Sequence, residues 1–313
     1  MGGVYGAHRM VARTCGAEGP LVWASPPIRA VIRRHMELQH HILLGASHLS
    51  GNGRLGRYVL LPGTRGRSAK IAEYLEDVVV IDNPRGHTAY LGGFRHEHGV
   101  VDVLVTSSGM GTASTEVILH ELLEAGARRV VRVGSSGSMD PNIRAGDAVI
   151  VTGAVRDELA TRHIAPTEYP AVSHPSAVAA MVEGARQTQH ASHTFLGVGH
   201  TKASLYAREF GHGPLGEQNR AYGETLARCG AVASDMEAAM LFIQASVRSA
   251  GHSASLSAGN ETVPVQAACV LGVYGDDESD MDLDPDLCAL ADRRAIEITL
   301  SGIVAWARLD GVI

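Results

Sequence analysis

Aromatic residues are scarce in this sequence, at 4% of 313 residues, and basic residues are slightly outnumbered by acidic ones. A protein that binds nucleic acid by stacking the bases needs aromatic platforms, so the composition argues against such a module. The formal net charge of −6 also argues against a surface that attracts nucleic acid or anionic membranes. Any phosphate group that the protein binds should therefore be met by a few well-placed arginines.

Long hydrophobic runs and closely spaced cysteines are missing as well. No stretch approaches the roughly 18 consecutive apolar residues that a bilayer-spanning helix requires, so no membrane segment is expected. The cysteines are far apart, with neither a CxxC pair nor a zinc-ligand spacing, which indicates reduced thiols in a cytoplasmic protein and predicts no metal site. They are Cys15, Cys229, Cys269 and Cys288.

The beginning of the chain differs in composition from the rest. It is rich in Arg, Ala and Gly and almost free of acidic residues, with Glu18 as the exception. We expect residues 1–36 to be a poorly ordered N-terminal extension, although the composition also resembles an organellar transit segment. Residues 37–313 are expected to form a single domain. Two polar segments without periodicity, near 46–56 and 250–264, are expected to be surface-loop insertions in it.

Apolar runs that end in glycine-rich turns alternate along the chain with amphipathic runs of helical period. This alternation predicts a parallel or mixed sheet flanked by helices. Ligands of such sheets bind where the strands open into glycine turns. Strands are expected at 57–63, 77–82, 100–109, 128–137, 147–155, 194–201 and 265–275, and helices at 68–77, 112–127, 177–189, 234–250 and 292–309.

One predicted strand carries an arginine inside an otherwise apolar run. A buried guanidinium is costly unless it meets an anion, and Arg132 is followed by a turn of small residues that begins at Ser135. Backbone N–H groups and hydroxyls of such a turn can surround an oxyanion while the arginine grips it with two hydrogen bonds. The pattern favours an anion site, and a buried structural salt bridge is the alternative.

Two further strand-to-helix turns have a similar character. After the first strand a Pro-Gly turn leads into a helix, and its amides could bind an anion beside Arg65 or Arg67, although surface arginines near turns are common. The segment 105–126 contains only a fragment of a dinucleotide-binding fingerprint, so a Rossmann dehydrogenase fits poorly.

Two acidic residues adjoin the apolar helix expected at 234–250. At least one carboxylate of Asp235 and Glu237 should face the interior or a cleft, where a buried acid needs hydrogen-bond donors. The two hydroxyls of a ribose are such donors, and Glu237 would accept from both. In the alternative interpretation Asp235 caps the helix and Glu237 is solvated.

Taken together, these segments resemble the family of uridine phosphorylases and purine nucleoside phosphorylases, over roughly residues 37–305. The stretch 131–172 is similar to uridine phosphorylases in the order and spacing of its residues, and 107–115 and 234–242 are similar to two other signatures of the family. The resemblance implies an α/β fold with a mixed, partly barrel-like central sheet, flanked by helices in a three-layer arrangement.

The resemblance also implies roles for individual residues. One arginine, Arg85, would reach the phosphate of a neighbouring subunit, and one histidine, His41, would reach the ribose across a dimer interface. The implied catalytic residues are Arg132, Glu237 and Arg67. The implied phosphate ligands are Gly63, Arg67, Arg85, Arg132 and Ser135, and the implied ribose ligands are His41, Met236 and Glu237.

The base site departs from the pattern of the family. Many uridine phosphorylases carry Gln and Arg after a Phe-Tyr pair, whereas this sequence has Leu205 and Tyr206 at that pair and no Gln at the expected offset. We expect Arg208 to donate to the pyrimidine carbonyl, with Gln218 or Arg220 folding back as its partner. The base-binding candidates are Gly137, Tyr206, Arg208 and Gln218.

A purine substrate is the alternative to uridine. Purine phosphorylases of the family use an Asp just after the late buried strand to protonate N7 of the base, and Asp276 lies one or two residues beyond that place. A solvated acidic loop is the plainer interpretation of Asp276. Uridine is therefore the favoured substrate, with a purine nucleoside or methylthioadenosine as the alternative.

The expected reaction is phosphorolysis of a nucleoside to a free base and ribose 1-phosphate. Positive charge would develop on the ribose and negative charge on the base, as in glycoside hydrolysis, with phosphate as nucleophile and no cofactor. The assembly is expected to be a homodimer or a ring of dimers with shared sites, and such an interface can also hold an ion. A nucleoside hydrolase would have no use for three arginines, and a non-catalytic relative would have no use for Glu237.

Overall fold

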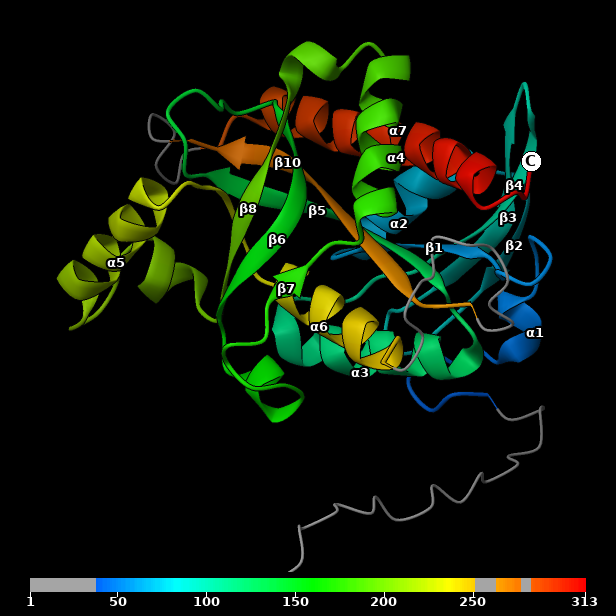
Figure 1. The fold of residues 1–313 in the computed structure, drawn as a ribbon, viewed down its shortest axis with the longest axis horizontal. Coiled ribbons are helices and arrows are strands. Elements are labelled where there is room, and N and C mark those ends of the chain that lie inside the picture. Colours follow the sequence, from blue (N-terminus) through cyan, green and yellow to red (C-terminus); the bar gives the residue numbers. More distant parts are fainter. Residues whose placement is uncertain (1–37, 251–262, 277–282) are drawn as a thin grey trace, which may run out of the picture. The chain divides into compact units, whose positions relative to one another are not determined.

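The structure, a computed structural model, describes residues 38–250, 263–276 and 283–313 (Figure 1). The N-terminal extension expected at 1–36 and most of the loop expected at 250–264 lie outside these residues. A mixed sheet of ten strands forms the centre of the described part, and helices lie on both of its faces. The α/β class and the partly barrel-like sheet expected from the sequence are confirmed. No helix among the described residues is long and apolar enough to cross a bilayer.

The central strand β5 (Arg129–Ser138) organises the sheet. It runs parallel to β10 along most of its length and to β1 over its first half, and it pairs antiparallel with β9 at its end. Strands β5, β10, β6, β8 and β9 close on one another into a barrel, and β1, β4, β3 and β2 extend the sheet beyond it. The other strands are β1 (Tyr58–Pro62), β2 (Glu76–Ile81), β3 (Ala89–His96), β4 (Gly99–Val105), β6 (Ala148–Asp157), β7 (Ala171–Val172), β8 (Thr194–Lys202), β9 (Ala231–Asp235) and β10 (Gln266–Gly275).

The longer helices form two layers around the sheet. Helix α4 packs against α7 on one face, and α3 packs against α6 on the other (Figure 1). Each layer has its own apolar core, because the buried side chains of the sheet alternate between the two faces. The α-helices are α1 (Ala46–Leu49), α2 (Arg65–Ala72), α3 (Gly111–Ala125), α4 (Pro175–Gln187), α5 (Gly216–Arg228), α6 (Ala238–Arg248) and α7 (Pro285–Leu309), with short 3₁₀ turns at Ala160–His163 and Ala191–His193 and a π turn at Leu205–Glu209.

Helices α4 and α7 approach closely at two glycines. A Cβ atom added at Gly184 would lie 2.4 Å from the carbonyl oxygen of Ile298 and 2.5 Å from the amide nitrogen of Gly302. We expect Gly184→Ala to lower the free energy of unfolding by about 1–3 kcal/mol, because backbone atoms of α7 cannot move aside without shifting the helix. Thermal and denaturant unfolding would measure the change. Gly223→Ala on α5, where nothing lies within 4 Å, is the matched control and should not be destabilising.

The structure corrects several expected boundaries. The helix expected at 68–77 ends at Ala72, because β2 begins at Glu76 and pairs with β3. The helix expected at 234–250 begins at Ala238, because the residues before it complete the barrel as β9. The segment near 46–56 is not a simple surface loop: it contains α1, and its Leu49 and Leu55 are buried. Strands β3, β7 and β9 and helix α5 were not expected from the sequence, and the helix expected at 292–309 begins earlier, at Pro285.

Candidate functional site

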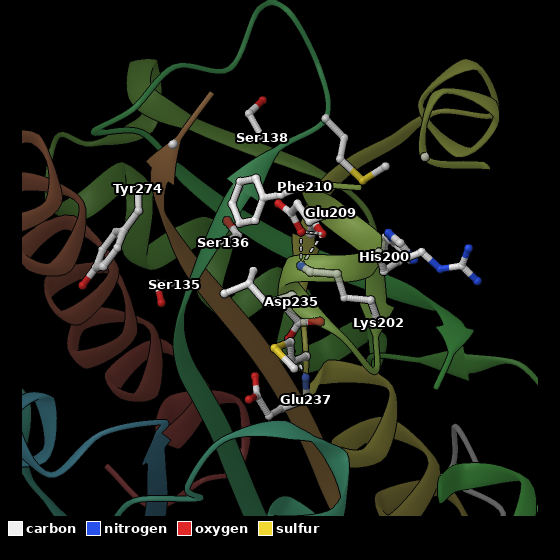
Figure 2. Close-up of a pocket in the computed structure, with 18 of the residues that line it drawn as sticks. Ser135, Ser136, Ser138, His200, Lys202, Glu209, Phe210, Asp235, Glu237 and Tyr274 are labelled. Carbon is white, nitrogen blue, oxygen red and sulfur yellow. Dashed lines mark hydrogen bonds and ion pairs between the residues drawn. The ribbon is translucent and has the colours of Figure 1, made fainter. Parts of the chain in front are cut away.

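A cavity of about 1130 Å³ opens at the end of the barrel where β5, β9 and β10 finish (Figure 2). The turns after β1, β4 and β9 line one end of it, and β8, the π turn and α5 line the other. Single small-molecule sites typically have volumes of roughly 300–1000 Å³, so this cavity has room for two ligands side by side. The place agrees with the expectation that ligands bind where the strands open into turns.

Arg132 is the central cation of the cavity and is 5% exposed. Its Nε donates to Asp235 at 3.0 Å, and its Nη2 is paired with Glu237. Burial alone would lower the pKa of the Arg132 guanidinium, but the carboxylates of Glu237 and Asp235 outweigh it and raise the pKa above its ordinary value. Arg132 is therefore charged, and the salt bridge considered from the sequence is present.

One nitrogen of the same guanidinium is left over. Nη1 of Arg132 is buried and has no hydrogen-bond partner among the described residues. A Cβ atom added at Gly63 would lie 4.0 Å from this nitrogen and 3.6 Å from the carbonyl oxygen of Gly109, so two glycine turns leave the space beside Nη1 open. Ser135 lines the same cavity, and the buried hydroxyl of Ser136 also has no partner in the described part of the chain. These groups together offer charge and donors to an anion.

Arg67 lines the cavity, but its guanidinium is engaged by a neighbouring helix. Its Nε and Nη2 donate to Asp292 at 2.9 and 2.7 Å, and Nη2 also donates to the hydroxyl of Tyr274 at 2.7 Å. Burial would raise the pKa of the Asp292 carboxyl, but Arg67 chiefly holds it below its ordinary value, with help from Tyr274 and Lys70. Burial is also the main reason that the pKa of Tyr274 rises to about 12.

Glu237 lies between the anion side of the cavity and the start of α3. Its Oε1 accepts from the amide of Gly111 at 2.6 Å, and its other oxygen pairs with Arg132. Asp235 accepts from the amides of Glu237 and Ala238 at 3.1 and 2.9 Å, so it caps α6 and holds Arg132 at the same time. Neighbouring Met236 lines the cavity. The carboxylate of Glu237 is thus fixed from two sides, as a sugar-binding acid requires.

A second charged network lies at the other end of the cavity. Asp157, at the end of β6, accepts from Arg208 at 2.7 and 2.9 Å and hydrogen bonds to His200 at 2.8 Å. Burial would raise the pKa of the Asp157 carboxyl, but His200 and Arg208 hold it below its ordinary value. The guanidinium of Arg208 also lies 4.4 Å from the ring centre of Tyr222 and donates to Asn219. Arg208 is therefore well anchored.

Two residues expected to act across a subunit interface lie close together but outside the cavity lining. Nδ1 of His41 hydrogen bonds to Glu121 at 2.6 Å. Buried Asn83 donates to the carbonyl oxygen of His41 and accepts from the amide of Arg85, both at 2.8 Å. The side chain of Arg85 is exposed. One asparagine thus fixes the backbone beside both residues.

One group of potential metal ligands lies outside the cavity. His96, Glu97 and His98, at the turn between β3 and β4, place ligand atoms within 4.8 Å of one another. None of the three lines the cavity. Within the cavity itself, the carboxylates described above are paired with arginines rather than directed at one another.

Comparison with known proteins agrees with this geometry. The family model of the phosphorylase superfamily matches residues 57–258. The chain belongs to the phosphorylase superfamily. A uridine phosphorylase of Treponema pallidum is 36% identical over 230 residues, which are 72% of this chain and 84% of that protein. A DeoD-type purine nucleoside phosphorylase of Hahella chejuensis is 30% identical over 203 residues, 64% of this chain and 79% of that protein.

The fold of this phosphorylase-superfamily chain is shared with a solved structure. A crystal structure of uridine phosphorylase from Vibrio fischeri superposes with a TM-score of 0.67 at 22% identity, covering 85% of this chain and 96% of that chain. The likeness at this identity concerns the arrangement of the sheet and helices. It places the barrel and its flanking helices in the architecture that the resemblance implied.

Most of the site residues predicted from the sequence line the cavity described above. They are Gly63, Arg67, Arg132, Ser135, Gly137, Tyr206, Arg208, Met236, Glu237 and Asp276. Asp276 is held by the turn before β6, because its Oδ2 accepts from the amide of Ala145 at 2.9 Å.

Gln218 is the predicted base ligand that the structure does not bring to the cavity. Residues of α5 that line it are spaced at helical intervals: Asn219, Arg220, Gly223, Glu224 and Ala227. Gln218 lies off this face and is exposed, and Asn219 rather than Gln218 or Arg220 partners Arg208.

Several residues of the site were not anticipated. Asp292 and Asp157 anchor Arg67 and Arg208, although each lies far from its partner in the sequence. Lys202 and Glu209 form a pair at the far end of the cavity. The sequence held a signal for Lys202, because it contains only two lysines and this one directly follows the apolar strand expected at 194–201.

Proposed function

We propose that this protein is a cytoplasmic nucleoside phosphorylase that cleaves uridine reversibly with inorganic phosphate to give uracil and ribose 1-phosphate. The observation that carries the proposal is the buried, unpartnered Nη1 of Arg132 beside the glycine turns, with Glu237 fixed next to it. A buried donor on a charged group is costly unless a ligand meets it, and phosphate supplies the missing acceptor. The Treponema pallidum relative supports uridine as the substrate.

The arrangement suits the charge changes of the reaction. Phosphate bound by Arg132, with Gly63 and Ser135 nearby, would be held beside C1' of the ribose. Glu237 and Met236 would hold the sugar, and the carboxylate would stabilise the positive charge that develops on it. Positioning of two bound reactants accounts for much of the rate of such a reaction, and no cofactor is part of this proposal.

Arg67 has a supporting part in this proposal. Its side chain lines the cavity while Asp292 and Tyr274 hold the guanidinium, so Arg67 adds positive charge beside the anion site without rearranging. Nη1 of Arg67 donates to the carbonyl oxygen of Val133 at 3.1 Å, so four of the five N–H donors of this guanidinium have partners in the described part of the chain. The second N–H of Nη1 is left for phosphate, and Arg67 can therefore bind the anion without releasing Asp292.

The experiment that tests the function compares nucleosides with and without phosphate. Purified protein is expected to release uracil from uridine only when phosphate is present, with ribose 1-phosphate formed in equal amount. Release of uracil at the same rate without phosphate would indicate a hydrolase, and no release from any nucleoside would indicate a binding protein. Each of these two results would overturn the proposal.

A purine nucleoside is the second candidate substrate. The observation in its favour is that Asp276 lines the cavity, where a purine phosphorylase needs an acid near N7. Against it, Oδ2 of Asp276 is already bound to the amide of Ala145, and the residue lies past the end of β10. Inosine cleaved faster than uridine, with that activity lost in Asp276→Asn, would reverse the assignment.

We also propose that the enzyme works as a homodimer, or as a ring of dimers, with His41 and Arg85 completing the site of a neighbouring subunit. The edge strand β2 exposes Val78, Val79 and Val80, and it leads directly into the loop that carries Arg85. An exposed apolar edge strand is a natural surface for a second copy. An ion at this interface is compatible with the proposal but plays no part in it.

Asn83 provides a test of the shared site. We expect Asn83→Ala to raise the KM for phosphate and uridine by on the order of 10-fold, because the backbones beside His41 and Arg85 lose their common hydrogen-bond partner. Steady-state kinetics combined with light scattering would separate this effect from loss of the oligomer. Unchanged kinetics in an intact oligomer would show that these two residues do not reach a site.

A further inference from the structure

The end of the cavity away from Arg132 contains a buried lysine. Lys202 is one of only two lysines in the sequence and is 2% exposed at the end of β8. Its Nζ donates to the hydroxyl of Ser234 at 2.6 Å and is paired with the carboxylate of Glu209, which also accepts from Ser234 at 2.7 Å (Figure 2). The proposed chemistry at Arg132 does not use these three residues.

The Lys202–Glu209 pair lies where the base of a bound nucleoside is expected. Strand β5 carries Arg132 near one end of the cavity and Gly137 near the other, about 16 Å away at roughly 3.3 Å per residue. Gly137 pairs with Ser234 of β9, and Glu237, the proposed ribose ligand, follows β9. A nucleoside with its ribose at Glu237 therefore directs its base away from Arg132 and toward Ser234.

The pair also has hydrogen-bonding capacity left over. The ammonium group of Lys202 has three N–H donors, and the two partners described use two of them. Oε2 of Glu209 is the atom bound by Ser234 and Lys202, whereas a Cβ atom added at Gly137 would lie 2.5 Å from Oε1. Oε1 thus lies against a strand that has no side chain there. One donor and one acceptor stand side by side at the cavity.

We infer that Lys202 and Glu209 hydrogen bond to the edge of the base and select bases that carry a carbonyl group beside a ring N–H. This inference rests on the proposed function. Lys202 donates to the carbonyl oxygen, and Glu209 accepts from the N–H. Uracil presents this edge. Cytosine presents an amino group and a bare ring nitrogen at the same two places, so both of its groups oppose the pair.

Two physical consequences follow from this assignment. A site that hydrogen bonds to both groups discriminates strongly, because a wrong base leaves one N–H of the buried ammonium group and one carboxylate oxygen without a partner. The ammonium group also lies where negative charge collects on the departing base, so Lys202 contributes to the rate as well as to specificity. Its partner Glu209 lies at the end of the short π turn Leu205–Glu209, a type of local structure that is frequent at functional sites.

The test measures kcat/KM with phosphate for uridine, cytidine and 3-methyluridine. We expect Lys202→Met to reduce the value for uridine by on the order of 100-fold and to reduce the preference for uridine over cytidine at least 10-fold. Glu209→Ala should bring uridine and 3-methyluridine closer together, because the acceptor for the ring N–H is gone. Glu209→Gln keeps a carbonyl acceptor and should keep most of that preference. Arg186→Met, which removes a positive charge from the exposed face of α4, is the matched control and should match wild type.

Binding of free uracil and cytosine, measured by calorimetry, separates this inference from the proposed function. Absence of all nucleoside cleavage in the wild type would refute the function, and a preference for uracil in binding that is lost in Lys202→Met and Glu209→Ala would still support the pair. If the folded Lys202→Met variant cleaves uridine and prefers it over cytidine as strongly as wild type does, the inference is overturned. If Lys202→Met does not fold, an unchanged preference of Glu209→Ala for uridine over 3-methyluridine would also overturn the inference.

Discussion

Arg132→Ala is expected to reduce kcat for phosphorolysis of uridine by about 100-fold to 1000-fold, which is the loss typical of removing one hydrogen-bond donor to the transition state. The guanidinium supplies the buried, unpartnered Nη1 that we assign to phosphate. It is also the counter-ion of both Asp235 and Glu237, each of which is at most 5% exposed. Removing one partner of a buried pair typically costs about 3–5 kcal/mol of stability, so this variant should also melt earlier.

Arg132→Lys separates the two effects. An ammonium group keeps the positive charge that Asp235 and Glu237 need, but it cannot bond to both acids and to phosphate in the planar geometry of a guanidinium. We therefore expect near wild-type melting and a KM for phosphate raised by at least about 10-fold. Steady-state kinetics at varied phosphate and thermal unfolding are the measurements. Turnover close to wild type at saturating phosphate in Arg132→Ala would remove this residue from the site.

The sequence predicted those parts of the fold in which local pattern and tertiary structure agree. Strand β5 was expected at 128–137 and helix α7 at 292–309, and both exist because their apolar residues repeat with a clear period. The strand β9 was missed because its last two residues, Ser234 and Asp235, were assigned to the start of the following helix. Only the pairing of β9 with both β5 and β8, which closes the barrel, makes these residues a strand.

The same distinction applies to the site. Arg132 was identifiable because a charge inside an apolar strand requires a partner, and Asp235 and Glu237 because acids beside an apolar helix require donors. The partners themselves could not be identified. Asp292 binds Arg67 across 225 positions of sequence, and only the packing of α7 against the sheet brings them together.

The base end shows how contacts in the fold change the role of a residue. Arg208 was expected to donate to the base, and its place in the cavity agrees with that expectation. Its guanidinium is nevertheless bound to Asp157 and Asn219 and lies over Tyr222. An arginine held in this way orders the π turn that carries Glu209, and we assign recognition of the base to the buried Lys202 beside it.

Glu237→Gln is expected to lower kcat for uridine by on the order of 100-fold while lowering the melting temperature less than Arg132→Ala does, because Arg132 keeps Asp235 as its counter-ion. The amide side chain can still accept from Gly111 through its oxygen, so the link to the start of α3 is retained. It loses the negative charge that faces Arg132 and that would stabilise the developing cation on the ribose. The buried site then holds Arg132 with Asp235 alone as its counter-ion, which should favour phosphate binding slightly rather than weaken it.

The diagnostic measurement for Glu237 is the comparison of uridine with 2'-deoxyuridine at varied phosphate. A carboxylate that accepts from both ribose hydroxyls contributes more to the riboside than to the deoxyriboside, so the preference for uridine should fall in Glu237→Gln while the KM for phosphate does not rise. Asp235→Asn is the matched comparison, because Asp235 also faces Arg132 but caps α6, and it should lower the melting temperature. A large fall in melting temperature of Glu237→Gln with unchanged turnover would instead make Glu237 a structural residue that holds Gly111 and Arg132 in place.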